Sequence, residues 1–549
     1  MKSMLTFDHS DIFVNIYITI IWEDILMTEI FKGDFLDDEK LSIRQWVNDN
    51  QPKMSQNITI GENEYIIFIV LDEHKRITGF KAIKPNVKYN EVKLVNSKYI
   101  AYRFYDLQDG MRFIAFNTIT RDFVFLEKLS AELLKCILDN DKLLLDAFCN
   151  ANELSTDDVN EFCNQLRDFG FFQSKNQDII NKTVNPNVPI SSDDSKYDPY
   201  LDDFKEILHH NGLFYSFHLD LTVLCNEKCV HCYHTFDKYD CSKELKTKEV
   251  LELIDKIYEI GVFSITISGG ECLLRKDFIE ILDYIATKHM LVSIFTNGTL
   301  LTDELVKQLL SYPINIVSVS LSLYGNNSEL HDSITQVKGS FDKTLAGISV
   351  LKKYDINFEL KCMVLEKNIS QMEDIRYFLR ELADGRECRV DTFLFSKMDG
   401  NTDNFAEQAT RDSLFNLIRT DPEFYFTVSR ARRRVNDFNE SPCVAGRYNL
   451  YCDSYGNIYP CVSFRLLLCK YTELSNIKNN VILKEWLDTK VCDFSDCFKH
   501  DYCEFCTEQC AGRNLLENND YLDSRNIVSC DKAKLILEWY NDTHSDNKI

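Results

Sequence analysis

Short apolar runs alternate with amphipathic segments through the middle of the chain. Runs typical of buried strands lie at 213–224, 262–268, 291–296 and 316–323. Segments of helical period lie between and after them, at 247–260, 277–288, 302–311 and 341–353. Such strand–helix alternation builds a parallel sheet or barrel whose site lies at the carboxyl ends of the strands. We therefore predict an α/β fold for this part of the chain.

The N-terminal third shows a different pattern. Residues 97–125 alternate as strands do, and residues 130–138 and 143–150 have helical period. A third helix is expected to begin after the N-cap Ser155, with Asp158 at its third position, and to end at Gly170. The apolar face of this helix consists of Val159, Phe162, Leu166 and Phe169. Strands followed by three short helices predict a small winged-helix-like domain.

These patterns divide the chain into six parts. Residues 1–90 contain alternating apolar runs to which no role is assigned, and Met27 is an alternative start. Pro186, Pro189 and Pro199 stand among Ser, Asn and Asp, which predicts a flexible linker. The expected parts are 1–90, a winged-helix-like domain at 91–175, a linker at 176–212, the barrel at 213–400, bridging helices at 401–440 and a Cys-rich domain at 441–549.

Composition narrows the possible functions. The 549 residues are 45% hydrophobic and 27% charged, which indicates a globular protein of about three or four domains. A net charge of −24 argues against a nucleic-acid partner, and the arginines at 430 and 432–434 are typical of a solvated helix face. The apolar stretch Ile12–Trp22 is too short to span a bilayer and does not resemble a secretory signal. Half of the twenty cysteines fall in two clusters, which favours a reducing cytoplasm with metal thiolates.

The first cysteine cluster is a C-x3-C-x2-C run formed by Cys225, Cys229 and Cys232. Three thiolates hold three corners of an iron-sulfur cube and leave the fourth iron open, whereas a structural zinc site uses four protein ligands. No fourth Cys or His stands at a matching spacing in the sequence. The run therefore favours a reactive iron-sulfur cluster, and a zinc site is the alternative.

Polar or glycine-rich segments follow the predicted strands. Gly-Gly-Glu at 269–271 ends one run, where bare backbone can approach a ligand beside a carboxylate. Asn-Gly at 297–298 and Tyr-Gly at 324–325 end the next two runs. The run at 213–224 leads into the cysteines. Because the carboxyl ends of parallel strands meet at one edge, we expect these tips to converge.

On these motifs, residues 213–400 resemble the radical S-adenosylmethionine (SAM) enzymes. The resemblance implies a partial (β/α)6 barrel of the TIM type in which the three cysteines bind a 4Fe-4S cluster. It also implies that the open iron takes SAM, whose reductive cleavage yields a 5'-deoxyadenosyl radical that abstracts hydrogen. The residues implied in SAM binding are Gly269, Gly270, Glu271, Asn297 and Ser322. Cys272 stands where the family frequently has proline.

The second cysteine cluster resembles the SPASM extension of the same enzymes, which carries two auxiliary 4Fe-4S clusters. Its seven members are Cys443, Cys461, Cys497, Cys503, Cys506, Cys510 and Cys530. The resemblance rests on the Cys, Gly, Cys spacing at its start, the Cys-x3-Cys pair and the distant last cysteine, while the central x5 and x2 gaps are exchanged. A zinc ribbon would use only four of the seven.

The resemblance, anchored on the shared final pair, implies two ligand sets. Cys443, Cys461 and Cys510 would hold the first auxiliary cluster, and Cys497, Cys503, Cys506 and Cys530 the second. The open iron of the first would bind a substrate thiolate or be closed by Cys492, Cys452 or another group. In sulfatase-maturing relatives an Asp base follows the second cysteine of the pattern; here Val462 follows, although Asp453 lies nearby.

The winged-helix-like pattern resembles the PqqD-like precursor-recognition domain of peptide-modifying enzymes. In that family a leader peptide adds to a sheet edge as an extra strand, and main-chain hydrogen bonds supply affinity. A winged helix is often a DNA reader, but the last helix predicted here has few basic residues. The resemblance therefore implies a peptide partner.

These resemblances imply a cytoplasmic radical SAM maturase of a ribosomally made precursor peptide, of the sactipeptide or ranthipeptide kind. The predicted cofactors are SAM and three 4Fe-4S clusters, with an external reductant such as a flavodoxin or ferredoxin, and no catalytic side chain is assigned. Thioether formation is the predicted reaction. Carbon–carbon crosslinking, epimerisation, sulfatase-type maturation, action on a folded protein or small metabolite, and a non-catalytic iron-sulfur or zinc scaffold are alternatives. A neighbouring Cys-rich reading frame would favour the thioether.

Overall fold

A computed structural model divides the chain into two compact units, Met1–Thr183 and Val184–Ile549, and each is described by itself. The residues that the structure describes are 18–22, 25–32, 55–60, 63–71, 77–83, 99–118, 120–139, 142–168, 170–171, 199–234, 240–311, 314–392, 394–420, 441–495, 500–505, 510–524 and 527–544.

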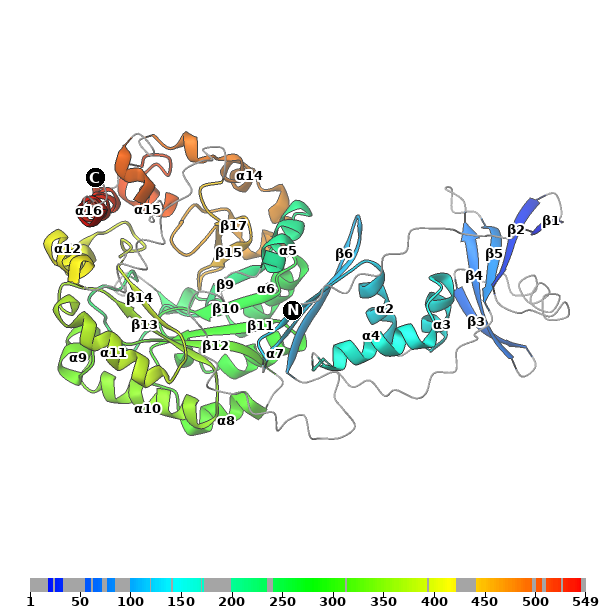
Figure 1. Ribbon diagram of the computed structural model, residues 1–549, viewed down its shortest axis with the longest axis horizontal. Helices are drawn as coiled ribbons and strands as arrows, with labels where there is room; N and C mark the ends of the chain where they lie inside the picture. The colour runs from blue at the N-terminus through cyan, green and yellow to red at the C-terminus, as the bar shows by residue number, and fades with distance from the viewer. Residues whose placement is uncertain are drawn as a thin grey trace. The chain divides into compact units, whose positions relative to one another are not determined.

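The first sheet of the N-terminal unit has five strands in the order β1-β2-β5-β4-β3 (Figure 1). Their bounds are Ile18–Trp22 for β1, Ile25–Lys32 for β2, Ser55–Ile60 for β3, Asn63–Leu71 for β4 and Ile77–Ile83 for β5. Strands β2 and β5 run parallel, and the other neighbours run antiparallel. The alternating runs of residues 1–90 thus include the strands of one sheet.

The second sheet of this unit is antiparallel, with the order β6-β7-β8. The elements are β6 (Ile100–Leu107), β7 (Gly110–Asn117), β8 (Phe123–Glu127), α2 (Leu129–Leu138), α3 (Lys142–Ala151) and α4 (Thr156–Asp168). Phe113 of the sheet, Leu134 of α2 and Phe162 of α4 are buried in one shared core. The predicted succession of strands and three helices is confirmed.

Helix α4 begins and ends where the sequence predicts. The amide of Ser155 donates to the Asp158 carboxylate at 2.7 Å, and the amide of Asp158 donates to Ser155 Oγ at 3.2 Å. Gly170 has a φ of 82°, a left-handed conformation that glycine adopts without strain. Phe162 and Leu166 of the predicted apolar face are buried together with residue 159, while residue 169 lies outside the described residues.

Asp158→Ala removes one half of this reciprocal cap and should destabilise α4 by about 1 kcal/mol. Amide hydrogens of the helix are then expected to exchange about fivefold faster in hydrogen-exchange mass spectrometry. Asp157→Ala is the matched control, because Asp157 lies in the same first turn and contributes its charge there. Equal exchange in the two variants would contradict a capping role for Asp158.

Six parallel strands form the framework of the second unit, in the order β14-β13-β12-β11-β10-β9. They are β9 (Ser216–Asp220), β10 (Ser264–Ser268), β11 (Leu291–Thr296), β12 (Asn315–Ser322), β13 (Phe358–Met363) and β14 (Cys388–Asp391). The helices between them are α6 (Thr247–Glu259), α7 (Phe278–Thr287), α8 (Asp303–Ser311), α9 (Ser328–Thr335), α10 (Ser340–Lys353) and α11 (Met372–Ala383). The predicted strand–helix alternation is confirmed.

The packing of α6 shows why this alternation buries a core. Val250, Leu253 and Ile257 recur at helical spacing and are buried on one side of α6. They belong to the same core as Ile265 and Ile267, two buried residues of β10. In Figure 1, α8 and α10 lie along the outer side of the curved sheet. The carboxyl ends of the strands therefore stay open for a site.

The sheet continues beyond β9 into the C-terminal region. Strand β15 (Asn449–Cys452) pairs in parallel with β9, and β16 (Asn457–Tyr459) and β17 (Cys469–Lys470) follow in antiparallel order. The other helices are α5 (Pro199–His210), α12 (Arg411–Thr420), α14 (Val481–Asp488), α15 (Ala511–Asn518) and α16 (Ile527–His544). The short 3-10 helices are Cys241–Lys243, Cys272–Leu274, Ile369–Gln371, Asp403–Glu407, Tyr471–Asn479, Val491–Asp493 and Asp501–Phe505.

The linker predicted at 176–212 is wrong from residue 199 onward. Pro199 is the first residue of α5, a position that suits proline because the first helical amide needs no partner. Glu206 of α5 accepts a hydrogen bond from Arg447 at 2.9 Å, which fixes the helix on the second unit. The remaining prolines of that segment, and the arginines at 430–434, lie outside the described residues. No described helix is both long and apolar enough to cross a membrane.

Candidate active site

The C-x3-C-x2-C cysteines lie in the loop that follows β9. Two backbone hydrogen bonds tie this loop to the end of α9: the amide of Lys228 donates to Thr335 O, and that of Val230 donates to Ile334 O, both at 3.0 Å. The amide of Cys232 donates to Cys229 O at 3.0 Å. The loop is thus held on a neighbouring element of the barrel.

The three thiols share a poorly solvated environment. Burial, to which neighbouring thiols and carboxylates add, raises the pKa of Cys225 to about 12 and that of Cys232 to about 11. It raises the pKa of Cys229 well above its ordinary value. Burial thus favours the neutral thiol. A bound metal favours the thiolate instead, because the thiolate is the form that binds the metal. The three residues therefore fit a group that brings positive charge to the loop.

Within the described part of the chain, no three Cys, His, Asp or Glu side chains lie close enough to hold a single metal ion. A four-iron cluster takes its thiolates at separate corners. The thiols at 225, 229 and 232 would supply three such ligands from one loop.

The Gly-Gly-Glu segment after β10 packs directly against backbone from the end of β9. The amide of Gly270 donates to Thr222 O at 2.8 Å, and that of Glu271 donates to Leu224 O at 2.7 Å. A Cβ at Gly270 would lie 2.3 Å from Leu224 O, and one at Gly269 would lie 2.4 Å from Thr222 O. Two strand ends can approach this closely only because both positions are glycine.

Glu271 is fully buried and links the ends of β10 and β11. Its Oε1 accepts from the Thr296 hydroxyl at 2.8 Å and from the amide of Leu273 at 3.0 Å, and its Oε2 accepts from the amide of Asn297 at 2.8 Å. Burial raises the pKa of this carboxyl above its usual value, although the hydrogen bonds act to lower it. The side chain thus fixes two strand ends beside the cysteine loop.

The other predicted SAM-contacting residues lie at the adjacent strand ends. Asn297 Nδ2 is 4.0 Å from Cys225 Sγ. Ser322 ends β12 and its side chain is hydrogen-bonded to Tyr324, whose ring centroid is 4.7 Å from that of His231 in the cysteine loop. The predicted convergence of the strand ends is confirmed, whereas the contacts with SAM stay a prediction.

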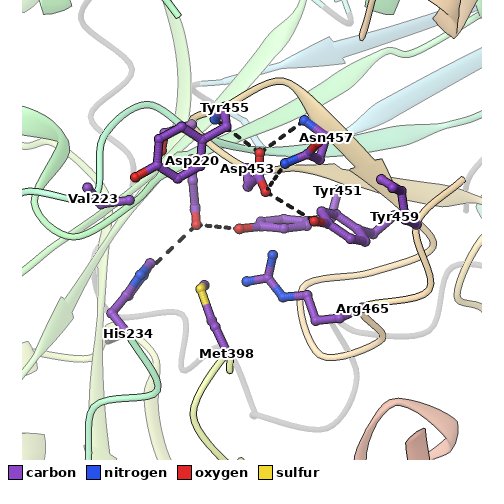
Figure 2. A pocket seen from close by; sticks show the side chains of 12 residues that line it. Asp220, Val223, His234, Met398, Tyr451, Asp453, Tyr455, Asn457, Tyr459 and Arg465 are labelled. Carbon is purple, nitrogen blue, oxygen red and sulfur yellow. Dashed lines mark hydrogen bonds and ion pairs between the residues drawn. The ribbon is translucent and has the colours of Figure 1, made fainter. Parts of the chain in front are cut away.

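A cavity of about 390 Å³ lies beside this loop (Figure 2). Its lining consists of Asp220, Val223, His234, Met398, Tyr451, Asp453, Ser454, Tyr455, Asn457, Tyr459, Arg465 and Leu467. The sequence analysis did not find this cavity, because its parts are remote: Asp220 and Tyr451 are 231 positions apart. The one feature of the sequence that could have pointed to the cavity is the group of closely spaced tyrosines between 448 and 459.

Asp220 is the buried carboxylate of this cavity. Its Oδ2 accepts from the Tyr451 hydroxyl at 2.6 Å, and its Oδ1 lies 3.3 Å from His218 Nε2. His234 Nε2 is 3.9 Å from Asp220 Oδ2. Burial acts to raise the pKa of Asp220, but these neighbours outweigh it and hold the pKa below its usual value. Asp220 is therefore ionised at neutral pH.

Asp453 is bonded within its own turn. Its Oδ1 accepts from the amides of Tyr455 and Asn457, both at 3.0 Å. Its Oδ2 accepts from Asn457 Nδ2 at 2.8 Å and from the Tyr459 hydroxyl at 3.2 Å. The carboxylate thus stabilises the connection between β15 and β16, which speaks against the role of a base considered for the sulfatase-type alternative.

Cys443 and Cys510, from two other segments of the chain, both lie close enough to Cys461 for their charges to act on it. Burial raises the pKa of Cys461 to about 12, and the charges of Cys510 and Cys443 add to the effect. These are the three residues implied for the first auxiliary cluster. Of the two candidate fourth ligands, Cys452 is buried in the hydrophobic core and Cys492 is exposed.

The second implied set is only partly described. Cys503 and Cys530 both lie near Tyr502, where their charges add to burial in raising the pKa of its hydroxyl. Cys497 and Cys506 lie outside the described residues. The assignment of this second set therefore stays a prediction.

Comparison with known proteins identifies the family. A profile of the Radical SAM superfamily matches residues 219–379. The AdoMet-dependent heme synthase of Methanosarcina barkeri is 30% identical over 265 residues, which are 44% of this chain and 75% of that protein. The chain belongs to the radical SAM superfamily. Members of this superfamily bind SAM and a 4Fe-4S cluster, so the protein is a radical SAM enzyme.

Two further proteins show similarity to this radical SAM enzyme. The antilisterial bacteriocin subtilosin biosynthesis protein AlbA of Bacillus subtilis is 28% identical over 320 residues, which are 56% of this chain and 69% of AlbA. The structure of Streptococcus suis SuiB bound to precursor peptide SuiA has a TM-score of 0.45 and 15% identity, and the match covers 79% of this chain and 99% of SuiB.

Gly270→Ala tests whether the close approach of β9 and β10 keeps the cysteine loop in place. The added methyl group would meet Leu224 O at 2.3 Å, so the two strand ends must separate. We expect loss of about four irons per chain on anaerobic reconstitution, together with loss of SAM binding. Lys248→Ala, at an exposed position of α6, is the control and should keep its irons. Full iron content in Gly270→Ala would refute the expectation.

Proposed function

We propose that this radical SAM enzyme modifies a ribosomally made precursor peptide and forms thioether bonds between cysteine sulfur and peptide carbon. The observation that carries the proposal is the cysteine loop, held at converging strand ends beside a cavity that is also lined by residues 451–459, which lie between Cys443 and Cys461 in the sequence. The similarity to AlbA, a bacteriocin biosynthesis protein, supports a peptide substrate.

In this proposal the cysteine loop holds the 4Fe-4S cluster through Cys225, Cys229 and Cys232, and SAM binds its open iron. When bound, cluster and SAM supply the 5'-deoxyadenosyl radical that removes hydrogen from the substrate. Asn297, beside Cys225, contacts SAM, and Glu271 fixes the strand end on which Asn297 stands. An external one-electron donor such as a flavodoxin or ferredoxin reduces the cluster.

The C-terminal cysteines would hold two auxiliary clusters. The first set, Cys443, Cys461 and Cys510, provides three ligands, which leaves an iron for the thiolate of the substrate. Formation of the carbon–sulfur bond from a carbon radical and a thiol releases one proton and one electron. Auxiliary clusters held by these cysteines would supply an acceptor for that electron. The Cys452 thiol donates to Asp453 O at 3.3 Å, which supports an open iron because this candidate ligand is engaged elsewhere.

The three-stranded sheet of the N-terminal unit is proposed to bind the leader of the precursor. Strands β6 and β8 stand at the two edges of this sheet, and each has one strand neighbour among the described residues. Edge strands present unpaired backbone donors and acceptors, to which an extended peptide adds as a further strand.

Other peptide modifications begin with the same step. Carbon–carbon crosslinking and epimerisation both begin with hydrogen removal from a peptide carbon, and mass spectrometry of the product separates them from a thioether. Heme synthesis is the second candidate function, because the heme synthase relative is matched over 75% of its length. Turnover of an iron porphyrin, with no change in any peptide, would favour it.

Cys443→Ala or Cys510→Ala should abolish the thioether while 5'-deoxyadenosine is still formed, because SAM cleavage needs only the cysteine loop. Replacing Cys225, Cys229 and Cys232 together by Ala should remove about four of about twelve irons and all SAM cleavage. Iron analysis and mass spectrometry of the peptide and the nucleoside measure these effects.

Cys241→Ala is the control for these variants, since this thiol lies in a separate 3-10 helix and should change neither iron content nor product. Normal crosslinked peptide from folded Cys443→Ala protein would show that the C-terminal cysteines are structural. Stoichiometric zinc in place of iron after anaerobic isolation would refute the cluster assignment.

Two truncations test the leader-binding domain. A chain that begins at residue 184 lacks the whole first unit, and we expect it to lose affinity for the full precursor while SAM cleavage without peptide continues. A chain that begins at residue 91 keeps the three-stranded sheet and should bind normally. Equal affinity of the two truncated chains would refute leader binding at this sheet, and tight DNA binding by the first unit would support the DNA-reader alternative.

A further inference from the structure

Arg465 brings a positive charge to the cavity beside the cysteine loop. It lines the cavity together with Tyr451 and Tyr459, and Figure 2 shows its guanidinium directed toward Tyr451. Its Nη2 is buried and has no hydrogen-bond partner among the described residues. The described carboxylates form no ion pair with it, and its contacts are the faces of the two tyrosines.

The two tyrosine rings hold the guanidinium in position. Its central carbon lies 4.5 Å from the ring centroid of Tyr451 and 5.1 Å from that of Tyr459. The tyrosines are themselves fixed, because the Tyr451 hydroxyl donates to Asp220 at 2.6 Å and the Tyr459 hydroxyl donates to Asp453 at 3.2 Å. The cation is therefore presented on a rigid support.

The carboxylates of the cavity are engaged with other donors. Asp220 accepts from Tyr451 and has His218 beside it, and Asp453 is bonded within its own turn. Burial alone lowers the pKa of an arginine, yet Tyr451 and Asp220 raise the pKa of Arg465 above its usual value, so it is charged at any physiological pH. A partly buried cation with an unfilled donor is costly unless an acceptor joins it.

We propose that Arg465 binds a carboxylate of the substrate and thereby positions the substrate against the cysteine loop. A planar carboxylate matches the geometry of a guanidinium, and the surrounding tyrosines exclude water from the pair. A doubly charged phosphate would meet stronger repulsion from Asp220 in the same cavity. The inference rests on the proposed function for its peptide substrate, which then carries an acidic side chain or a free C-terminus near the reacting residue.

The cavity that contains Arg465 lies next to the cysteine loop. Asp220, the last residue of β9, and His234, two residues after Cys232, both line it. A ligand held by Arg465 therefore lies next to the loop on which the cluster forms. Arg465 is assigned as a positioning residue for the substrate, not as a participant in hydrogen removal.

Small acids test the site with the full, anaerobically reconstituted chain. N-acetylglutamate and its uncharged counterpart N-acetylglutamine are titrated and followed by ligand-observed NMR. The wild-type enzyme should bind the acid at least about tenfold more tightly than the amide. Arg465→Gln should abolish this preference, and Arg465→Lys should keep part of it. Arg411→Gln, which removes only an exposed pair with Glu538, is the matched control and should behave as wild type.

Three results would overturn the proposal: no detectable binding of the acid, equal affinity for acid and amide, or an unchanged preference in Arg465→Gln. Thermal unfolding separates a binding role from a structural one. Arg465→Gln removes the contacts with two tyrosine rings and the attraction of Asp220, so the Tm of the ligand-free chain should fall, whereas added acid should raise the Tm of the wild-type chain only. A lowered Tm with unchanged acid preference would mark Arg465 as structural.

Two versions of a precursor peptide locate the carboxylate. One has neutral side chains and a free C-terminus, and the other has acidic side chains and a C-terminal amide. The version whose KM rises in Arg465→Gln carries the bound group. Failure of the proposed function would appear as no peptide modified while the acid preference persists. Failure of this inference would appear as modified peptide with a KM that does not depend on Arg465.

Discussion

One buried carboxylate holds the loops of the active site together. Glu271 accepts from the Thr296 hydroxyl and from two backbone amides, while its own amide donates to Leu224 O, in the segment between β9 and Cys225. A carboxylate without access to water must keep such partners, because an unsatisfied buried charge costs several kcal/mol. The cysteine loop and the strand end that bears Asn297 consequently share a single fixed point.

The barrel was predictable because its signals are local. Three of its strands, β10, β11 and β12, are short apolar runs followed by a glycine or an asparagine, and the run at 262–268 became β10 at Ser264–Ser268. The cap at Ser155 is chemistry between residues three positions apart, so the sequence displays it directly. The structure also places two of the cysteines implied for the first auxiliary cluster near the third, Cys461, a proximity that only the family resemblance had implied.

What the sequence did not reveal depends on contacts between remote segments. The stacking of Arg465 on Tyr451, and the bond from Tyr451 to Asp220, exist only after β15 has paired with β9. Pro199 was misread for a related reason. A proline is common both in linkers and in the first turn of a helix. Here Pro199 begins α5, whose side chains Phe204 and Leu208 are buried.

Strand β9 is hydrogen-bonded on both sides, to β10 and to β15. A shift of β9 by one residue would break two ladders at once and turn every side chain to the opposite face of the sheet. An insertion or deletion before Cys225 therefore cannot be accommodated by a shift of β9 along its neighbours. An insertion there must bulge into the loop and displace the thiols, so evolution should tolerate length changes in the exposed turn between α11 and β14 far more readily than in the segment from β9 to the first cysteine.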